Sequence, residues 1–287
     1  MLAFVTSLRH PDNASDYDRV EELLRRTLRS IEQQTSDDYV VIVVGNRAPS
    51  FELPARTRFV YVDFPAAAEP TKREERWEAV IADKGSKLAV GLLAARAYSP
   101  DYVMVTDADD FVHRGLVRWV GEQPEGSLGW YVADGWRYSA LRGAGERIDD
   151  MYRVCGTCYI APWSAYAVPD ELPVSASQAE VWEAFGERAR FILGKHRDAE
   201  KWFAEHGYPL ERLPVPGSVY HVDTGENHSG KRIDGEARMM PRAVAREFGI
   251  THDHPLPVRW WRCQGLSLRR AIARRVRRVL RLRGKQA

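Results

Sequence analysis

Short apolar runs alternate with amphipathic segments in the first part of the chain. Continuous runs of aliphatic and aromatic residues are typical of strands buried on both faces, and they occur at residues 2–7, 39–44, 58–62 and 102–106. Between them, apolar residues recur at helical spacing from Val20 to Ile31 and from Leu88 to Ala97. This alternation predicts an α/β fold, in which a mostly parallel sheet is flanked by helices on both faces.

The pattern is less regular after residue 112. Apolar runs predict strands at residues 129–133, 159–161 and 219–222, and helical spacing predicts helices at 181–193 and 196–203. A polar loop then covers residues 223–232 and combines carboxylate, amide, imidazole and cationic side chains between glycines. We interpret this loop either as a ligand-binding loop or as a flexible surface loop.

A chain of 287 residues is long enough for one large domain or for two halves that share a core. Cys155, Cys158 and Cys263 are too few for a disulfide framework, so we expect them to be buried and reduced. The first residues lead directly into a predicted strand without a signal peptide, and no apolar stretch is long enough to cross a bilayer. These features predict a cytoplasmic protein.

The net charge of +2 conceals a strongly basic segment, because residues 259–287 contain eleven arginines and lysines and no acidic residue. Within 265–284, apolar residues form one helical stripe among these cations. The pattern predicts a basic amphipathic helix on an anionic membrane surface, with Trp260 and Trp261 at the interface. One alternative is a nucleic-acid partner, although no nucleic-acid-binding module is recognisable, and another is a helix folded onto the acidic body of the protein.

Carboxylates follow the apolar run at residues 102–106. In an extended chain, residues two apart point to the same side, so Asp107 and Asp109 would present two hard oxygen ligands together. Such a pair suits Mg²⁺ or Mn²⁺ holding a diphosphate, and the carboxyl end of a central strand is where open α/β sheets bind ligands. The alternative is an acidic turn without a ligand.

The chain has neither the glycine fingerprint of a dinucleotide-binding fold nor a P-loop, so side chains and a metal would have to hold a phosphate. Lys84 and Lys87 are predicted to lie at the start of the helix that precedes the acidic strand. Cations at a helix N-terminus oppose the helix dipole. We therefore interpret these lysines as contacts to an anionic ligand, although solvated surface lysines are the common alternative.

The order strand, helix, strand, strand, lysine-bearing helix, strand and Asp107-Ala108-Asp109-Asp110 resembles the GT-A glycosyltransferases, particularly the family 2-like group. The segment from Lys84 to Leu92 corresponds to the family's Gly- and Asn-containing stretch before the acidic motif. The resemblance covers residues 1–112 and is partial beyond them. In this chain Gly45-Asn46 replaces the family's usual Asp, and the usual Arg-Asn pair is missing, with Lys87 the nearest cation.

The resemblance implies a GT-A, Rossmann-like domain that binds a nucleotide-diphospho-sugar donor linked to UDP, dTDP or GDP. It divides the chain into a donor-binding half at 1–112, an acceptor-binding half of the same domain at 113–258, and a basic tail at 259–287. Residues implied near the base, ribose or diphosphate are Ser7, Arg9, Asn46, Lys84, Lys87 and Asp107. Metal ligands implied are Asp109, Asp107 and a histidine from the second half, His228 or else His221. The implied catalytic base is Asp198, with Glu200 as a second candidate.

We therefore predict a glycosyltransferase that depends on Mn²⁺ or Mg²⁺ and transfers a sugar, with inversion, to a lipid-linked or polymeric cell-envelope glycan. Retention is the alternative stereochemical outcome, because the fold does not set it. The enzyme would act in the cytoplasm or on the inner face of the cell membrane. One alternative is a nucleotidyltransferase that makes nucleotide sugars, although its glycine-rich basic signature is absent after the first strand. The other is a non-catalytic membrane- or nucleic-acid-binding protein on a degenerate transferase scaffold, which the intact Asp107-x-Asp109 pair disfavours.

Overall fold

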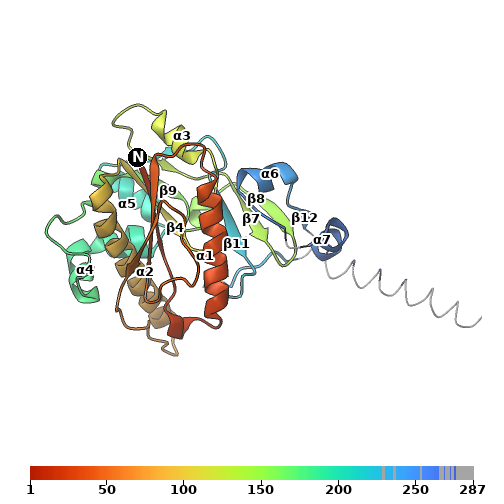
Figure 1. Ribbon diagram of the computed structural model, residues 1–287, viewed down its shortest axis with the longest axis horizontal. Helices are drawn as coiled ribbons and strands as arrows, with labels where there is room; N and C mark the ends of the chain where they lie inside the picture. The colour runs from red at the N-terminus through yellow and green to blue at the C-terminus, as the bar shows by residue number, and fades with distance from the viewer. Residues whose placement is uncertain are drawn as a thin grey trace, which may run out of the picture.

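A computed structural model describes residues 1–227, 230–234, 237–252 and 254–264, together with positions 268, 272 and 275. Two sheets lie next to each other, with helices packed around them (Figure 1). The predicted tail helix at 265–284 falls almost entirely outside the described residues, and so does His228. Among the described helices, none is long and apolar enough to cross a membrane.

The first sheet contains seven strands in the order β10-β6-β9-β4-β1-β2-β3. Its four parallel strands are β1 (Leu2–Ser7), β2 (Tyr39–Gly45), β3 (Thr57–Tyr61) and β4 (Tyr102–Asp107). Strand β9 (Tyr159–Pro162) runs antiparallel to β4, and β6 (Trp130–Tyr131) and β10 (Glu211–Arg212) complete the edge. The predicted α/β fold with a mostly parallel sheet is therefore confirmed.

Helices α1 (Tyr17–Glu32) and α2 (Arg73–Ala95) connect the parallel strands. Because the chain crosses in opposite directions from β1 to β2 and from β3 to β4, right-handed crossovers place the two helices on opposite faces of the sheet. Helix α2 packs closely on β1 because residue 91 is glycine: a Cβ atom there would lie 2.4 Å from Cγ1 of Val5. The face of α2 that carries Trp77 is therefore held next to the carboxyl end of β1.

The second sheet has five strands in the order β12-β8-β7-β11-β5, and its hairpin and short edge strands were not predicted from the sequence. They are β5 (Phe111–Val112), β7 (Gly135–Ser139), β8 (Ala144–Ile148), β11 (Ser218–Val222) and β12 (Arg238–Met239). Strand β5 begins one residue after Asp110, so the acidic loop joins the two sheets. A loop tied at both ends to different sheets has little freedom to move.

Five shorter helices complete the described structure: α3 (Leu116–Gly121), α4 (Gln178–Phe185), α5 (Ala199–Glu205), α6 (Arg242–Glu247) and α7 (Leu256–Cys263). Short 3₁₀ turns occur at Pro11–Asn13, Arg96–Tyr98, Met151–Arg153 and Trp163–Tyr166. The three cysteines are buried and form no disulfide, as predicted.

Two predicted helices have different bounds in the structure. The helix expected at 181–193 is divided, because α4 stops at Gly186 (φ +51°) and a π-helical segment follows at Ala189–Gly194. The placement of Lys84 and Lys87 at a helix N-terminus was wrong, since α2 begins at Arg73 and both lysines lie inside it. The charged segment 73–83 consists largely of good helix formers and extends the helix by three turns. Neither lysine therefore opposes the helix dipole at the N-terminus of α2, and the dipole does not indicate an anionic ligand.

Candidate active site

A cavity of about 1150 Å³ opens at the carboxyl ends of β1 and β4. Ser7 ends β1, Asp107 ends β4, and the side of α2 that carries Trp77 and Lys84 forms another wall. Residues 194–198 and the loop at 153–156 close the remaining sides. This volume exceeds the usual range of about 300–1000 Å³ for small-molecule sites, so the cavity has room for two substrates together.

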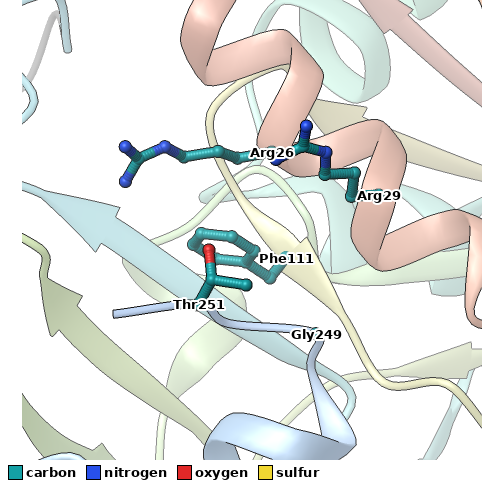
Figure 2. A pocket seen from close by; sticks show the side chains of 5 residues that line it. All are labelled: Arg26, Arg29, Phe111, Gly249 and Thr251. Atoms are coloured by element: carbon teal, nitrogen blue, oxygen red, sulfur yellow. The ribbon is translucent and has the colours of Figure 1, made fainter. Parts of the chain in front are cut away.

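A second cavity, between α1, β5 and the segment after α6, has a volume of only about 10 Å³ (Figure 2). Arg26, Arg29, Phe111, Gly249 and Thr251 line it. Its size corresponds to a single water molecule, and no carboxylate, thiol or imidazole lines it. It is therefore a packing defect and has no site chemistry.

The acidic loop forms a turn at the end of β4. The backbone N–H of Asp110 donates to the carbonyl of Asp107 at 3.2 Å, so Ala108 and Asp109 lie in a turn and not in an extended chain. The extended geometry predicted for Asp107 and Asp109 is therefore wrong. Both residues nevertheless line the large cavity, because the turn directs the loop toward the end of β1.

Asp107 is held by three contacts, two to its carboxylate and one to its backbone. Nζ of Lys84 lies 2.5 Å from Oδ1, the backbone N–H of Gly156 donates to Oδ2 at 3.2 Å, and the backbone N–H of Asp107 donates to Oγ1 of Thr157 at 2.9 Å. Burial raises the pKa of Asp107, but the Lys84 charge outweighs burial and leaves that pKa below its ordinary value. Burial lowers the pKa of Lys84, and Asp107 more than compensates. Both groups are therefore charged at neutral pH.

Asp109 has a different electrostatic environment. Burial and the neighbouring Asp107 charge raise the pKa of Asp109 to about 7. Its own backbone amide, Lys84 and Arg9 offset only part of this rise in pKa. A carboxylate that holds its proton near neutral pH at the wall of a cavity is typical of a site completed by a ligand or a cation.

Asp110 lies beneath the cavity and does not line it. Its side chain is 1% exposed, and it accepts hydrogen bonds from Oγ1 of Thr157 at 2.7 Å, Sγ of Cys155 at 3.0 Å and the backbone N–H of His221 at 2.9 Å. Burial and the charges of Asp109 and Asp107 raise its pKa well above the ordinary value. Asp110 therefore anchors the acidic loop to β11 and to the loop before β9.

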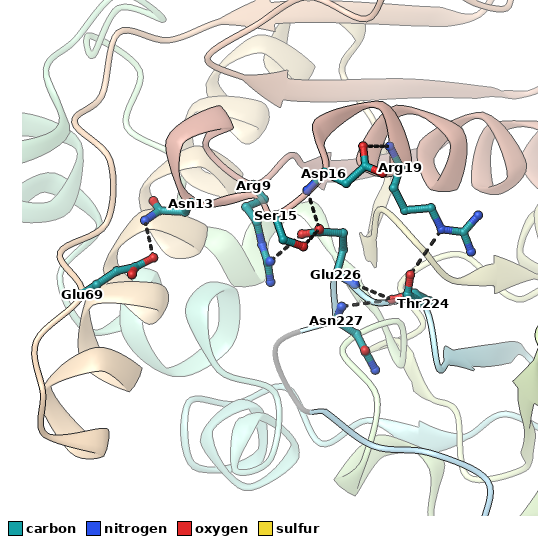
Figure 3. Close-up of polar contacts among 9 residues, drawn as sticks. All are labelled: Arg9, Asn13, Ser15, Asp16, Arg19, Glu69, Thr224, Glu226 and Asn227. Carbon is teal, nitrogen blue, oxygen red and sulfur yellow. Dashed lines mark hydrogen bonds and ion pairs between the residues drawn. The ribbon is translucent and has the colours of Figure 1, made fainter.

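Glu226 closes one side of the cavity by binding the loop between β1 and α1 (Figure 3). Its carboxylate accepts from Nη1 of Arg9 at 2.7 Å, from the backbone N–H of Asp16 at 2.9 Å and from the hydroxyl of Ser15. Nε of Arg19 also donates to the carbonyl of Thr224 at 3.2 Å, which further fixes the loop that carries Glu226. Part of the polar loop at 223–232 is thus an ordered wall, while His228 and Ser229 lie outside the described residues.

The wall at residues 194–198 is brought to Lys84 by close backbone packing. A Cβ atom at Gly85 would lie 2.3 Å from the carbonyl oxygen of Ala189, so glycine permits the π-helical segment to contact α2. The hydroxyl of Tyr159 then donates to the carbonyl of His196 at 2.9 Å. Burial and the nearby Lys84 lower the pKa of His196 to about 4, so its ring is neutral at physiological pH.

Asp198 is an exposed carboxylate on the same wall. It precedes α5 at the N-cap position, yet its side chain makes no capping hydrogen bond. An N-cap aspartate normally accepts from the helix backbone. The side chain of Asp198 is therefore available to a bound molecule.

The structure brings some of the predicted site residues to the cavity and not others. Lining it are Ser7, Arg9, Lys84, Asp107, Asp109 and Asp198. Four do not line it. Asn46 donates to the carbonyl of Phe64 at 2.7 Å, and Glu200 lies on α5 away from the cavity. Lys87 is fully buried and paired with Asp83 at 2.8 Å, and buried His221 stacks on Tyr138.

Several residues at the cavity were not singled out in the sequence. Glu226 belongs to the polar loop at 223–232, His196 begins a predicted helix, and Gly156 lies between two of the cysteines. Each acquires its place through contacts between distant parts of the chain, such as Arg9 with Glu226, which no local spacing encodes. The single local hint was the unusual composition of residues 223–232.

The donor set suits a hard divalent cation. Among the described residues, no group of three or more His, Cys, Asp or Glu side chains is arranged around one point. Asp107 and Asp109 line the same cavity and would supply two carboxylates, with substrate phosphates and water completing the coordination. This is the usual arrangement for Mg²⁺, which proteins bind through one or two carboxylates plus phosphate oxygens. The residues present thus fit the expected Mg²⁺ or Mn²⁺.

No protein-family model matches the chain, and a search of curated proteins finds no similar sequence. Among solved structures, it resembles S. aureus TarS 1–349 in complex with UDP-GlcNAc, with 11% identity and a TM-score of 0.44 over 91% of this chain and 70% of TarS 1–349. The chain also resembles another crystal structure of TarS 1–349, with 10% identity and a TM-score of 0.41 over 77% of this chain. It spans 60% of the length of that structure.

A Bacillus anthracis structure described as a glucose-1-phosphate thymidylyltransferase in complex with sucrose is also similar. It has 10% identity and a TM-score of 0.42 over 80% of this chain and 92% of its own. Similarity at this level carries no conclusion about the fold or the reaction of this chain.

Proposed function

We propose that this protein is a metal-dependent glycosyltransferase that uses a nucleotide-diphospho-sugar donor. The observation that carries the proposal is the shared cavity of Asp107, Asp109, Lys84 and Asp198 at the carboxyl end of a central strand. Two carboxylates suit a cation, a lysine suits a phosphate, and an uncapped carboxylate suits an acceptor hydroxyl. A glycosyl transfer to an alcohol needs these three functions together.

On the donor side, Asp107 and Asp109 would hold Mn²⁺ or Mg²⁺ together with the diphosphate. The cation supplies charge stabilisation for the leaving diphosphate without a proton transfer. Lys84 stays charged beside Asp107 and adds a second positive group for phosphate oxygens. Ser7 and Arg9 line the same end of the cavity and would contact the ribose or base.

On the acceptor side, Asp198 would take the proton of the attacking hydroxyl. Inversion requires the base on the face of the sugar opposite to the leaving diphosphate. Asp198 reaches the cavity from the start of α5, whereas Asp107 and Asp109 reach it from the end of β4. Inversion is therefore part of the proposal and rests on Asp198 acting as this base.

The acceptor we propose is a lipid-linked or polymeric glycan of the cell envelope, reached from the cytoplasmic face of the membrane. The support is the basic segment 259–287, whose eleven cations would be attracted to anionic lipid by about 1 kcal/mol each. A docked enzyme meets a lipid-linked acceptor at high local concentration.

Calorimetric titration with UDP, dTDP and GDP, with and without Mn²⁺, tests the donor site. Wild type should bind one nucleotide tightly in a metal-dependent manner, and Asp109→Ala should lose that binding. Asp149→Ala is the matched control, because the side chain of Asp149 is 85% exposed and does not line the cavity. If no nucleotide binds under any condition, the transferase proposal is wrong and the degenerate-scaffold alternative replaces it.

The bound nucleotide also decides between transfer and nucleotide-sugar synthesis. A glycosyltransferase should bind the diphosphate and slowly hydrolyse the matching nucleotide sugar. A nucleotidyltransferase should instead bind the triphosphate and release pyrophosphate when a sugar phosphate is added. Release of pyrophosphate would overturn the proposed reaction while leaving the nucleotide site intact.

A further inference from the structure

Helix α7 exposes its apolar side chains and buries a cation. Its buried positions are Arg259 and Cys263, which are 5% and 1% exposed. A helix on the surface of a soluble protein normally does the reverse. The exposed apolar residues of α7 are Leu256 (45%), Val258 (38%), Trp260 (50%) and Trp261 (39%).

Contacts with the turn between β7 and β8 fix this orientation. The guanidinium of Arg142 donates to the carbonyls of Arg262 at 3.1 Å and Cys263 at 2.7 Å, which caps the C-terminus of α7. The thiol of Cys263 donates back to the carbonyl of Arg142 at 3.4 Å. Arg259 packs on Gly143, where a Cβ atom would lie 3.1 Å from its Cγ. The outward direction of the tryptophans is therefore set by the fold.

The same turn adds a fifth apolar side chain. Leu141 is 61% exposed, and its carbonyl accepts from Nη1 of Arg262 at 3.0 Å, which places the turn beside α7. We call Leu141, Leu256, Val258, Trp260 and Trp261 the α7 patch. Figure 1 shows α7 next to β12 and β8, in the second sheet. None of the five residues lines the large cavity, so the patch is separate from the candidate active site.

The charge next to the patch indicates what covers it. Residues 259–287 carry eleven cations and no carboxylate, and this segment includes part of α7 itself. A second copy of the chain on the patch would bring two such segments together, and their repulsion opposes a dimer. An anionic lipid surface instead attracts the cations, and tryptophan is favoured at the depth of the lipid headgroups.

We propose that the α7 patch inserts into the headgroup region of an anionic membrane while the basic segment binds the lipid phosphates. The inference deepens the membrane docking included in the proposed function, and it does not depend on the reaction at the cavity. It adds Leu141, Leu256 and Val258 to the two tryptophans expected at the interface, and all five belong to a folded, described surface. Docking by the basic segment alone would need none of the five apolar residues.

Flotation of the full chain with vesicles tests the proposal, using equal parts of phosphatidylglycerol and phosphatidylcholine at physiological ionic strength. The double variant Trp260→Ser and Trp261→Ser keeps every cation of the chain. Its partition onto vesicles should fall by roughly tenfold or more, because binding scales with the apolar area inserted. Partition within about twofold of wild type would overturn the proposal, since it would leave charge as the sole attraction.

The matched control is Tyr61→Ser with Leu128→Ser, two exposed apolar side chains at other places on the surface (61% and 42%). It should bind vesicles like wild type, and an equal loss in the control would also overturn the proposal. Light scattering of wild type and the tryptophan variant tests whether a second copy of the chain covers the patch. A molar mass that is halved in the variant would assign the patch to a dimer. Nucleotide titration of the same variants reports separately on the donor site.

Discussion

Asp109 and Asp110 are neighbours in the chain but lie on two different sides of the acidic loop. On the buried side, Asp110 accepts hydrogen bonds from a hydroxyl, a thiol and a backbone amide. On the cavity side, Asp109 faces the charge of Asp107 and has no such set of donors among the described residues. The buried side is complete without a ligand, whereas the cavity side is not.

The difference separates structural carboxylates from functional ones. Burial raises the pKa of both residues, so a perturbed pKa alone does not distinguish them. The distinction comes from which hydrogen-bond donors the fold supplies. A group whose donors come from the protein stabilises the loop, and a group that lacks them is stabilised only when something binds.

The largest effect is expected on the buried side. Asp110→Ala leaves Thr157 and the backbone N–H of His221 without their acceptor, and should lower the free energy of unfolding by about 3 kcal/mol. Chemical denaturation followed by circular dichroism measures this. Asp110→Asn keeps an acceptor oxygen in the same place and should cost less than half as much. Equal losses for the two variants would mean that packing, and not hydrogen bonding, is what Asp110 contributes.

Gly156→Ala should damage the cavity side with a smaller effect on folding. A Cβ atom at this position would lie 2.5 Å from Oδ2 of Asp107, so the carboxylate must move. We expect metal-dependent nucleotide binding to weaken roughly tenfold or more, and the free energy of unfolding to fall by about 1–2 kcal/mol. Gly121→Ala is the control, since a Cβ there has nothing within 4 Å. Unchanged binding in Gly156→Ala would show that the position of Asp107 is not critical.

Asp109→Asn should stabilise the protein at pH 8. Because the pKa of Asp109 is raised to about 7, the folded state binds more protons than the unfolded state between about pH 4 and 7. The contribution of Asp109 to the free energy of unfolding is therefore fully present below pH 4 and is lost as pH rises through 7. Asparagine does not ionise, so the variant does not undergo this loss. We expect a gain of about 1–2 kcal/mol at pH 8, after allowance for solvent screening, and none near pH 4. A gain of equal size at both pH values would contradict the assigned titration.

The smallest effect is on the pH dependence of cation binding. A cation bound at Asp109, as proposed, would compete with its proton, so the affinity for Mn²⁺ should fall by up to about tenfold per pH unit below 7 and level off above 7. Calorimetry in two buffers with different ionisation enthalpies measures the released proton directly. In Asp109→Asn this proton release should disappear. Proton release that persists in the variant would assign the titration to another group.

The four parallel strands and the position of the carboxylates after β4 were predictable from sequence, because both depend on local patterns. A run such as residues 102–107 has the composition of a buried strand wherever it occurs, and the chain order then determines which end of the sheet receives Asp107. The buried, reduced cysteines were predictable from their number alone.

The remainder depends on contacts that spacing does not encode. Lys84 and Lys87 are three residues apart, yet one reaches Asp107 in the cavity and the other is buried against Asp83. Which side of α2 faces the cavity follows from the start of the helix at Arg73 and from the close approach at Gly91. The hairpin of β7 and β8 was missed because its apolar residues are few and interrupted by charges.

The contact between Arg9 and Glu226 has a consequence for biosynthesis, because the two residues are separated by 217 positions. A ribosome that makes about 5–20 residues per second needs roughly 10–40 seconds to supply the second partner after the first. During this interval strands β1 to β4 are already synthesised, but the wall contributed by Glu226 is absent. The cavity is therefore completed only after residue 226 has been synthesised, and a chain terminated before that residue lacks this wall.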